Sequence, residues 1–313
     1  FLVKVAVYQA MNSDFGCEGI SIGPNLKKIG EALGAKACYP ENGVDYLTSQ
    51  PLFDYKDFSR FEIPAPQTNT VLKAMLLDIK SYKQHFGQNF AVGTDIGGPF
   101  TTAMSIRPAE MILKDTIQQP DNLKLLLDFS VECELSWVKT AYELFGVSSV
   151  NIADPGASIS LIGPRMFREL AAPPLQKLFD GCQKITGKIP NLHICGKTKP
   201  IWDDLANIGF TSFRVDNCED LAELKSAVGT RMAISGNIPP VDVLLNGSID
   251  DVINSARNCI AKCGDNPRGY TLAGGCQLPI GVSKANLLAM LYAARKYAPL
   301  ARIGKYYLPE QFS

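Results

Sequence analysis

The sequence has no surplus of charge of either sign, because 31 lysine and arginine residues balance 31 aspartate and glutamate residues. Proteins that bind nucleic acid non-specifically usually carry a basic surplus, so this balance argues against nucleic acid as a partner. No apolar run reaches the roughly 18 residues that a membrane-spanning helix requires, and the first residues lack the pattern of a signal peptide. We therefore expect a cytoplasmic protein with no membrane partner.

Histidine is scarce, at two residues, whereas cysteine is frequent, at nine. An odd number of cysteines in a chain of 313 residues argues against a framework of disulfides. Reduced thiols fit better, and some of them could bind a metal ion.

Short β-rich runs alternate with longer amphipathic segments along the chain, which predicts a parallel sheet covered by helices. The predicted fold is a (β/α)8 TIM barrel, and an open doubly wound sheet is the alternative. We expect a single barrel domain over residues 1–313, with an insertion around 36–68. The seven predicted strands are 19–22, 90–94, 149–153, 191–194, 210–215, 232–235 and 269–272.

The predicted helices follow apolar residues at helical spacing and neighbouring glycine or proline. Because the chain opens on an apolar run without methionine, we expect a missing N-terminal segment to hold the first of eight strands. The predicted helices are 24–33, 69–85, 121–145, 164–186 with a division at Pro173-Pro174, 201–208, 221–228, 249–262 and 283–297.

A candidate metal site begins at the strand that carries His193 and Cys195. Residues two apart on a strand point to the same face, so an imidazole and a thiol would converge there. A second strand leads through two glycines to Cys276, and these glycines would let the backbone turn tightly. One nitrogen and two sulfurs suit zinc, and a catalytic zinc commonly keeps a fourth position open. A core role for these residues is the alternative, since cysteine is often a small buried hydrophobe.

Several motifs around these residues resemble the uroporphyrinogen decarboxylase superfamily. Within it, they are most similar to the zinc-dependent methylcobamide:coenzyme M methyltransferases. The resemblance is carried by Gly97-Gly-Pro-Phe-Thr101, Asp154-Pro-Gly-Ala-Ser158, His193-Ile-Cys195-Gly196, Ser235-Gly-Asn-Ile-Pro239 and Ala273-Gly-Gly-Cys276-Gln-Leu-Pro.

The resemblance implies a zinc-dependent methyltransferase that moves a methyl group from a methylated corrinoid protein to a thiol acceptor such as coenzyme M. Zinc would favour the thiolate form of the acceptor, which is the nucleophile. Tetrahydrofolate or another thiol is an alternative acceptor. Three further alternatives are a donor-side methyltransferase that moves a methyl group from an O- or N-methyl substrate to a corrinoid protein, a uroporphyrinogen-type decarboxylase, and a non-catalytic zinc-binding barrel.

Neither histidine fits the Asp-x-His-x-x-Gly pattern of corrinoid-binding proteins. Lys83 stands two residues before His85, and Asn191 stands two residues before His193. We therefore expect a separate corrinoid protein to supply the methyl-corrinoid. A homo-oligomer is compatible with the sequence.

Two acids at predicted strand ends are candidate catalytic residues. Asp154 could bind substrate or orient His193, although Asp-Pro-Gly is also a common turn sequence. The resemblance implies an acid near Asp216 as a fourth zinc ligand, and the alternative is a helix cap or turn residue.

Overall fold

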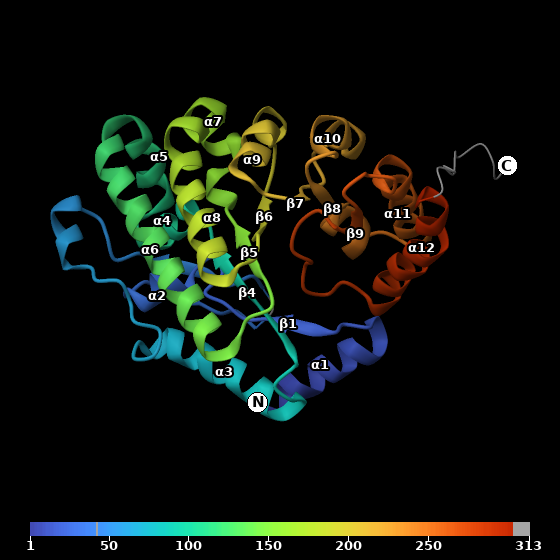
Figure 1. The fold of residues 1–313 in the computed structure, drawn as a ribbon, viewed down its shortest axis with the longest axis horizontal. Coiled ribbons are helices and arrows are strands. Elements are labelled where there is room, and N and C mark those ends of the chain that lie inside the picture. Colours follow the sequence, from blue (N-terminus) through green and yellow to red (C-terminus); the bar gives the residue numbers. More distant parts are fainter. Residues whose placement is uncertain (42, 303–313) are drawn as a thin grey trace. The chain divides into compact units, whose positions relative to one another are not determined.

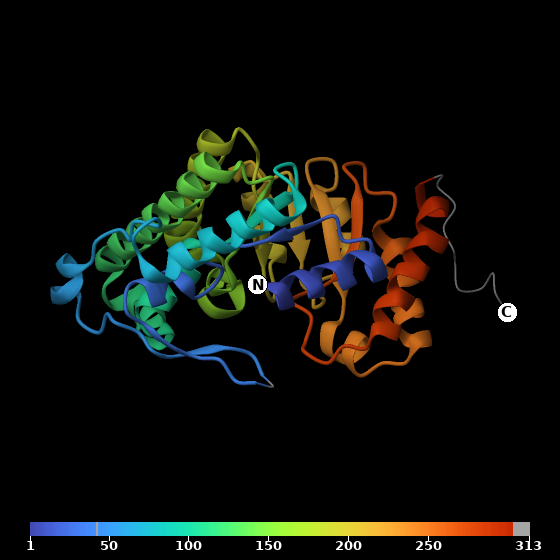
Figure 2. The ribbon, with the colours of Figure 1, turned by 90° about the horizontal axis from the view of Figure 1, so that it is seen from below.

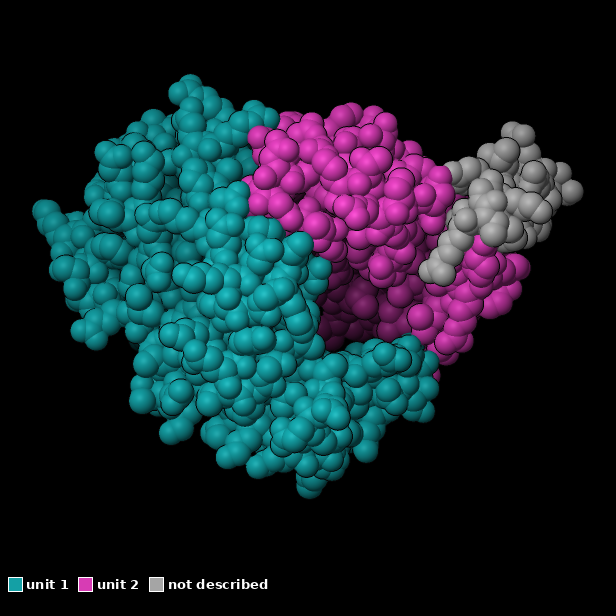
Figure 3. Space-filling model, in the orientation of Figure 1, with its two compact units in different colours: residues 1–192 teal, residues 193–313 magenta. Residues whose placement is uncertain are grey.

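The structure is a computed structural model that describes residues 1–41 and 43–302. Strands and helices alternate along the chain in two views at right angles (Figures 1 and 2). The chain divides into two compact units, residues 1–192 and 193–313 (Figure 3). Each unit has its own buried apolar side chains. That both units form one domain stays a prediction.

The first unit contains strands from both sheets and the longest helix. Asn69 caps one of its helices by accepting hydrogen bonds from the backbone N–H groups of Val71 and Leu72. Its elements are α1 (Leu2–Phe15), β1 (Gly19–Ser21), α2 (Lys28–Ala32), β2 (Lys36–Cys38), β3 (Tyr46–Ser49), η1 (Tyr55–Arg60), α3 (Thr70–Phe86), β4 (Ala91–Gly97), α4 (Pro99–Ile106), α5 (Ala109–Gln118), α6 (Pro120–Phe145), β5 (Val150–Ala153), η2 (Pro155–Ala157), α7 (Ile159–Met166), η3 (Phe167–Ala171) and α8 (Ala172–Thr186).

Strand β6 (Asn191–Ile194) crosses the boundary into the second unit. A capping box of Ser248 and Asp251 begins helix α11 (Ile249–Cys263) there. The remaining elements are η4 (Lys199–Ile201), α9 (Trp202–Ile208), β7 (Ser212–Val215), α10 (Leu221–Val228), β8 (Ala233–Ile238), η5 (Pro240–Leu245), α11 (Ile249–Cys263), β9 (Tyr270–Gly274) and α12 (Lys284–Arg302).

The main sheet has seven strands among the described residues, in the order β1-β4-β5-β6-β7-β8-β9. In the first unit, β4 pairs in parallel with β1 and β5. In the second unit, β8 pairs in parallel with β7 and β9. The predicted alternation of helices with a parallel sheet is confirmed, and all seven predicted strands are present. The eighth strand stays a prediction.

The structure differs from the predicted elements in several places. The expected insertion around 36–68 contains the antiparallel pair β2 and β3 and the helix η1. The predicted division at Pro173-Pro174 does not interrupt the helical backbone, which continues from the π-helix η3 into α8. Both prolines lie in the first turn of α8, where proline is tolerated. Helices α1, α4 and α5 were not predicted.

None of the helices in residues 1–41 and 43–302 is long and apolar enough to cross a membrane.

Helix α6 brings a carboxyl group into the core of the first unit. Glu134 is fully buried, and its Oε1 accepts hydrogen bonds from the Gly97 N–H at 3.2 Å and the Thr102 hydroxyl at 2.7 Å. Its Oε2 has no hydrogen-bond partner among the described residues. Burial raises the pKa of Glu134 to about 8, so the carboxyl keeps its proton at neutral pH.

Because this pKa is raised in the folded state, the unfolded chain releases the Glu134 proton at a lower pH. We expect the free energy of unfolding to fall as pH rises from about 4.5, the usual range for an unfolded glutamate, to about 8. Urea denaturation of the Glu134→Gln variant, which cannot ionise there, should show a flatter decline over this interval. Glu132→Gln, an exposed neighbour on α6, is the control and should follow the wild-type slope. Equal slopes for wild type and Glu134→Gln would contradict the assignment.

Candidate metal centre

The end of β6 brings two of the predicted donors together. His193 and Cys195 stand two residues apart, and the His193 Nε2 lies 3.1 Å from the Cys195 Sγ. Gly196 follows with a φ of 76°, a left-handed backbone conformation that residues other than glycine rarely adopt. The strand itself ends at Ile194, so Cys195 lies just beyond it rather than on it, and the chain bends at Gly196, directly after the second donor.

The loop after β9 adds the third donor. The Sγ atoms of Cys195 and Cys276 are 3.4 Å apart. A Cβ atom at Gly275 would lie only 2.5 Å from the Asn217 backbone nitrogen, so the approach of this loop to the end of β7 requires glycine. The chain bends at Gly275 and Cys276, directly after β9.

The three donor atoms lie within 4.8 Å of one another, and all three residues are partly exposed. Zinc bond lengths of about 2.3 Å to sulfur and 2.0 Å to nitrogen place tetrahedral ligand atoms about 3.5 to 3.8 Å apart. The observed 3.1 and 3.4 Å are a few tenths of an ångström shorter. A small outward shift of the side chains would accommodate zinc, so the residues fit the metal. Since they are partly exposed, a fourth ligand could reach it.

The two cysteines share the stabilisation of one negative charge. Hydrogen bonds with Cys195 and His193 lower the pKa of the Cys276 thiol to about 4. The same contact with Cys276, together with burial, raises the pKa of Cys195. Cys276 is therefore the more easily ionised of the two, and the thiolate is the form that binds metal.

Arg214 on β7 is a residue of this site that the sequence interpretation missed. Its backbone carbonyl oxygen lies 2.9 Å from the His193 Nδ1. Its guanidinium donates hydrogen bonds to the carbonyl oxygens of Gly274 and Cys276. The sequence held little signal for this role, since an arginine between Phe213 and Val215 also fits the half-exposed face of a strand.

Asp216 lies close to the donors but is not one of the three-residue group. Its Oδ2 accepts a hydrogen bond from the Gly196 N–H at 2.8 Å, and its Oδ1 accepts one from the Cys218 N–H at 3.0 Å. Asp216 thus supports the turn after Cys195, in keeping with the turn alternative. A catalytic role for Asp216 stays a prediction.

Asp154 in the first unit follows β5 as predicted and is fully buried. Its Oδ1 accepts hydrogen bonds from the backbone N–H and the hydroxyl of Thr101, both at 2.8 Å, which satisfies donors in the first turn of α4. Burial raises the pKa of Asp154 to about 6. The His193 Nδ1, for which Asp154 was a candidate partner, instead lies beside the Arg214 carbonyl. A catalytic role for Asp154 stays a prediction.

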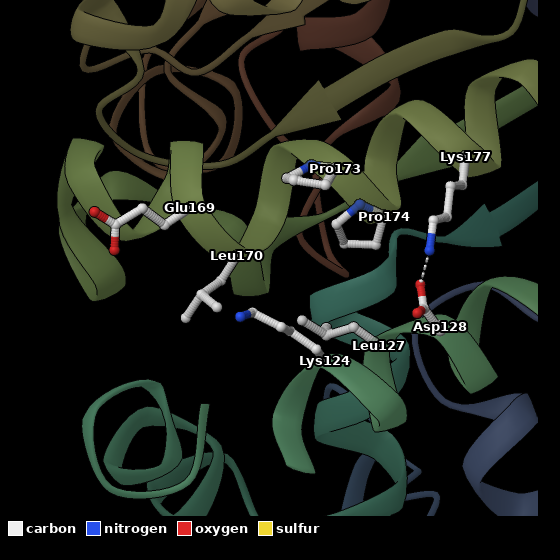
Figure 4. A pocket seen from close by; sticks show the side chains of 8 residues that line it. All are labelled: Lys124, Leu127, Asp128, Glu169, Leu170, Pro173, Pro174 and Lys177. Carbon is white, nitrogen blue, oxygen red and sulfur yellow. Dashed lines mark hydrogen bonds and ion pairs between the residues drawn. The ribbon is translucent and has the colours of Figure 1, made fainter. Parts of the chain in front are cut away.

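A separate pocket of about 150 Å³ lies in the first unit beside α6, η3 and α8 (Figure 4). An ion pair between Lys177 and Asp128 closes one side of it, and Leu127, Leu170 and two prolines form apolar walls. It contains none of the three donor residues.

Comparisons with known proteins find methyltransferases that match most of this chain. Methylcobamide:CoM methyltransferase MtaA of Methanosarcina barkeri is 28% identical over 284 residues, covering 90% of this chain and 80% of that protein. Methylcobamide:CoM methyltransferase MtbA of Methanosarcina mazei is 27% identical over 248 residues, covering 79% and 69%. The solved structure of a methyltransferase from Methanosarcina mazei matches with a TM-score of 0.80 and 26% identity, over 92% of this chain and 83% of that one.

The structural match also confirms a TIM-barrel-like fold class. The family model "Uroporphyrinogen decarboxylase (URO-D)" matches residues 5–297, which is nearly the whole chain. The chain therefore belongs to the uroporphyrinogen decarboxylase (URO-D) family.

Proposed function

We propose that this protein is a zinc-dependent methyltransferase that moves a methyl group from a methylated corrinoid protein to a thiol acceptor such as coenzyme M. The observation that carries the proposal is the convergence of one imidazole nitrogen and two cysteine sulfurs within 4.8 Å, with all three residues partly exposed. The names of the similar MtaA and MtbA proteins support the substrate pair.

His193 would bind the metal through Nε2. A backbone carbonyl can only accept a hydrogen bond, so the contact with the Arg214 oxygen requires the proton on Nδ1. On metal binding, Nε2 would give up any proton it shares with the cysteine sulfurs and present its lone pair on the side on which Cys195 lies. Cys276 would bind as the thiolate, and Cys195 would release its proton on binding.

Zinc, when bound, lowers the pKa of a substrate thiol and so favours its thiolate. The partly exposed donor residues leave room for a small thiol to approach them. The acceptor sulfur would attack the methyl carbon of the methylated corrinoid. A carbon–sulfur bond forms as the cobalt–carbon bond breaks, and its electron pair stays on cobalt. The donor residues themselves neither form nor break a covalent bond to carbon.

The metal assignment predicts zinc content. Wild-type protein purified without chelator should contain about one zinc per chain, and Cys276→Ser should contain far less, because a hydroxyl is a poor zinc ligand beside a thiolate. Cys17→Ser, a partly exposed cysteine of the first unit, is the matched control and should keep its zinc. Metal analysis by mass spectrometry measures all three. Wild-type protein without zinc, or Cys276→Ser with a full complement, would refute the metal site.

The reaction predicts thiol-dependent loss of the methyl group from methylcobalamin. With coenzyme M present, wild-type protein should demethylate methylcobalamin. His193→Ala should be slower by roughly a hundredfold or more. Loss of a residue that only hydrogen-bonds to a metal ligand typically costs 10- to 100-fold, and loss of the ligand itself should cost at least as much. Visible absorbance follows the cobalt product, and Cys17→Ser again serves as control.

The same assay separates the alternatives. A donor-side enzyme would methylate cobalt(I) cobalamin from an O- or N-methyl compound and would ignore thiols. Activity with tetrahydrofolate but no thiol would change the acceptor while leaving the metal site intact.

A further inference from the structure

One residue of β7 contacts both chain segments that carry the donors. Arg214 lies on the strand with an alternating pattern of burial, in which Phe213 and Val215 are buried and Arg214 is partly exposed. Its backbone oxygen meets the His193 imidazole, whereas its side chain reaches the loop of Cys276. The second set of contacts comes from the guanidinium and would be lost with the side chain.

The guanidinium bonds have a specific arrangement. Arg214 Nε donates to the Gly274 carbonyl at 3.2 Å, and Nη2 donates to the same oxygen at 3.1 Å and to the Cys276 carbonyl at 2.7 Å. The two carbonyls stand on either side of Gly275. A planar guanidinium can bridge two acceptors in fixed directions, which an ammonium group cannot do as well.

The loop that receives these bonds needs external support. Gly274 and Gly275 precede Cys276, and glycine loses more backbone freedom on ordering than other residues. Hydrogen bonds to the carbonyls of a glycine-containing turn restrict that freedom before any ligand binds. The Arg214 side chain therefore holds the backbone of Cys276 in the position from which its sulfur reaches Cys195.

We propose that Arg214 is the positioning residue of the donor site: its guanidinium fixes the loop of Cys276 so that the three donors are arranged before a metal arrives. This inference rests on the proposed metal site and adds to it a residue that is not itself a ligand. A side chain that orders a ligand-bearing segment should raise metal affinity, and loss of such a partner typically costs 10- to 100-fold.

The test compares metal affinity in three variants. Arg214→Met removes the donors and keeps much of the apolar stem. Arg214→Lys keeps the charge but lacks the planar fork. Arg268→Met is the matched control, because Arg268 also donates to a backbone carbonyl in the second unit, that of Thr230, away from the three donors. Competition with a chromophoric chelator gives the zinc affinity of each full-length protein.

We expect Arg214→Met to bind zinc about 10- to 100-fold more weakly than wild type, Arg214→Lys to recover only part of the loss, and Arg268→Met to match wild type. Cobalt(II) provides a second measurement, since sulfur-to-cobalt charge-transfer absorption reports the number of bound thiolates. Its intensity should fall in Arg214→Met if Cys276 is displaced. Thermal unfolding of the metal-free proteins shows whether each variant is folded, and Arg214→Lys provides the affinity test if Arg214→Met is not.

Two results would overturn the inference while sparing the metal site: wild-type zinc affinity and cobalt spectra in both Arg214 variants, or an equal loss of affinity in Arg268→Met. Wild-type protein that binds neither zinc nor cobalt would overturn the proposed function and this inference together. The two failures are therefore distinguishable from one set of titrations.

Discussion

The hydrogen bonds made by Arg214 connect the two segments from which the candidate metal centre is built. One bond joins the end of β6 to the β7 backbone, and the others join the last residue of β9 and the loop after it to the β7 side chain. Parallel strands end at the same edge of a sheet, so β7 can reach both segments with short contacts. A further hydrogen bond, from the Gly275 N–H to the Ile238 carbonyl at 2.9 Å, ties the same loop to the end of β8.

The chemistry of the donors follows from that close placement. Two thiols at 3.4 Å cannot both ionise easily, and their contact lowers the pKa of Cys276 while it raises that of Cys195. A metal ion that replaces the remaining proton would relieve this restriction. The pair is thus suited to a cation, whereas in a purely structural role two adjacent neutral thiols would serve as small apolar groups.

Buried acids in the first unit show a different use of carboxyl groups. Asp154 satisfies backbone donors at the start of α4, and Glu134 accepts hydrogen bonds from Gly97 and Thr102. Burial raises the pKa of both groups because the charged form is poorly solvated there. An acid after a strand in this fold can therefore stabilise the backbone of the neighbouring segment, and its position in the sequence alone does not make it catalytic.

The sequence by itself determined the strands, most helices and the membership of His193, Cys195 and Cys276 in one candidate group, because strand periodicity and glycine turns are local properties. The tertiary structure decided the distances between the donors, the capping bonds of Asp154 and Asp216, and the part played by Arg214. These depend on which backbone groups from distant segments come within hydrogen-bonding range. An arginine that alternates with apolar residues on a strand fits a solvent-facing position. The carbonyls 60 and 62 residues further along the chain become its acceptors only when the end of β9 and the loop after it lie close to β7.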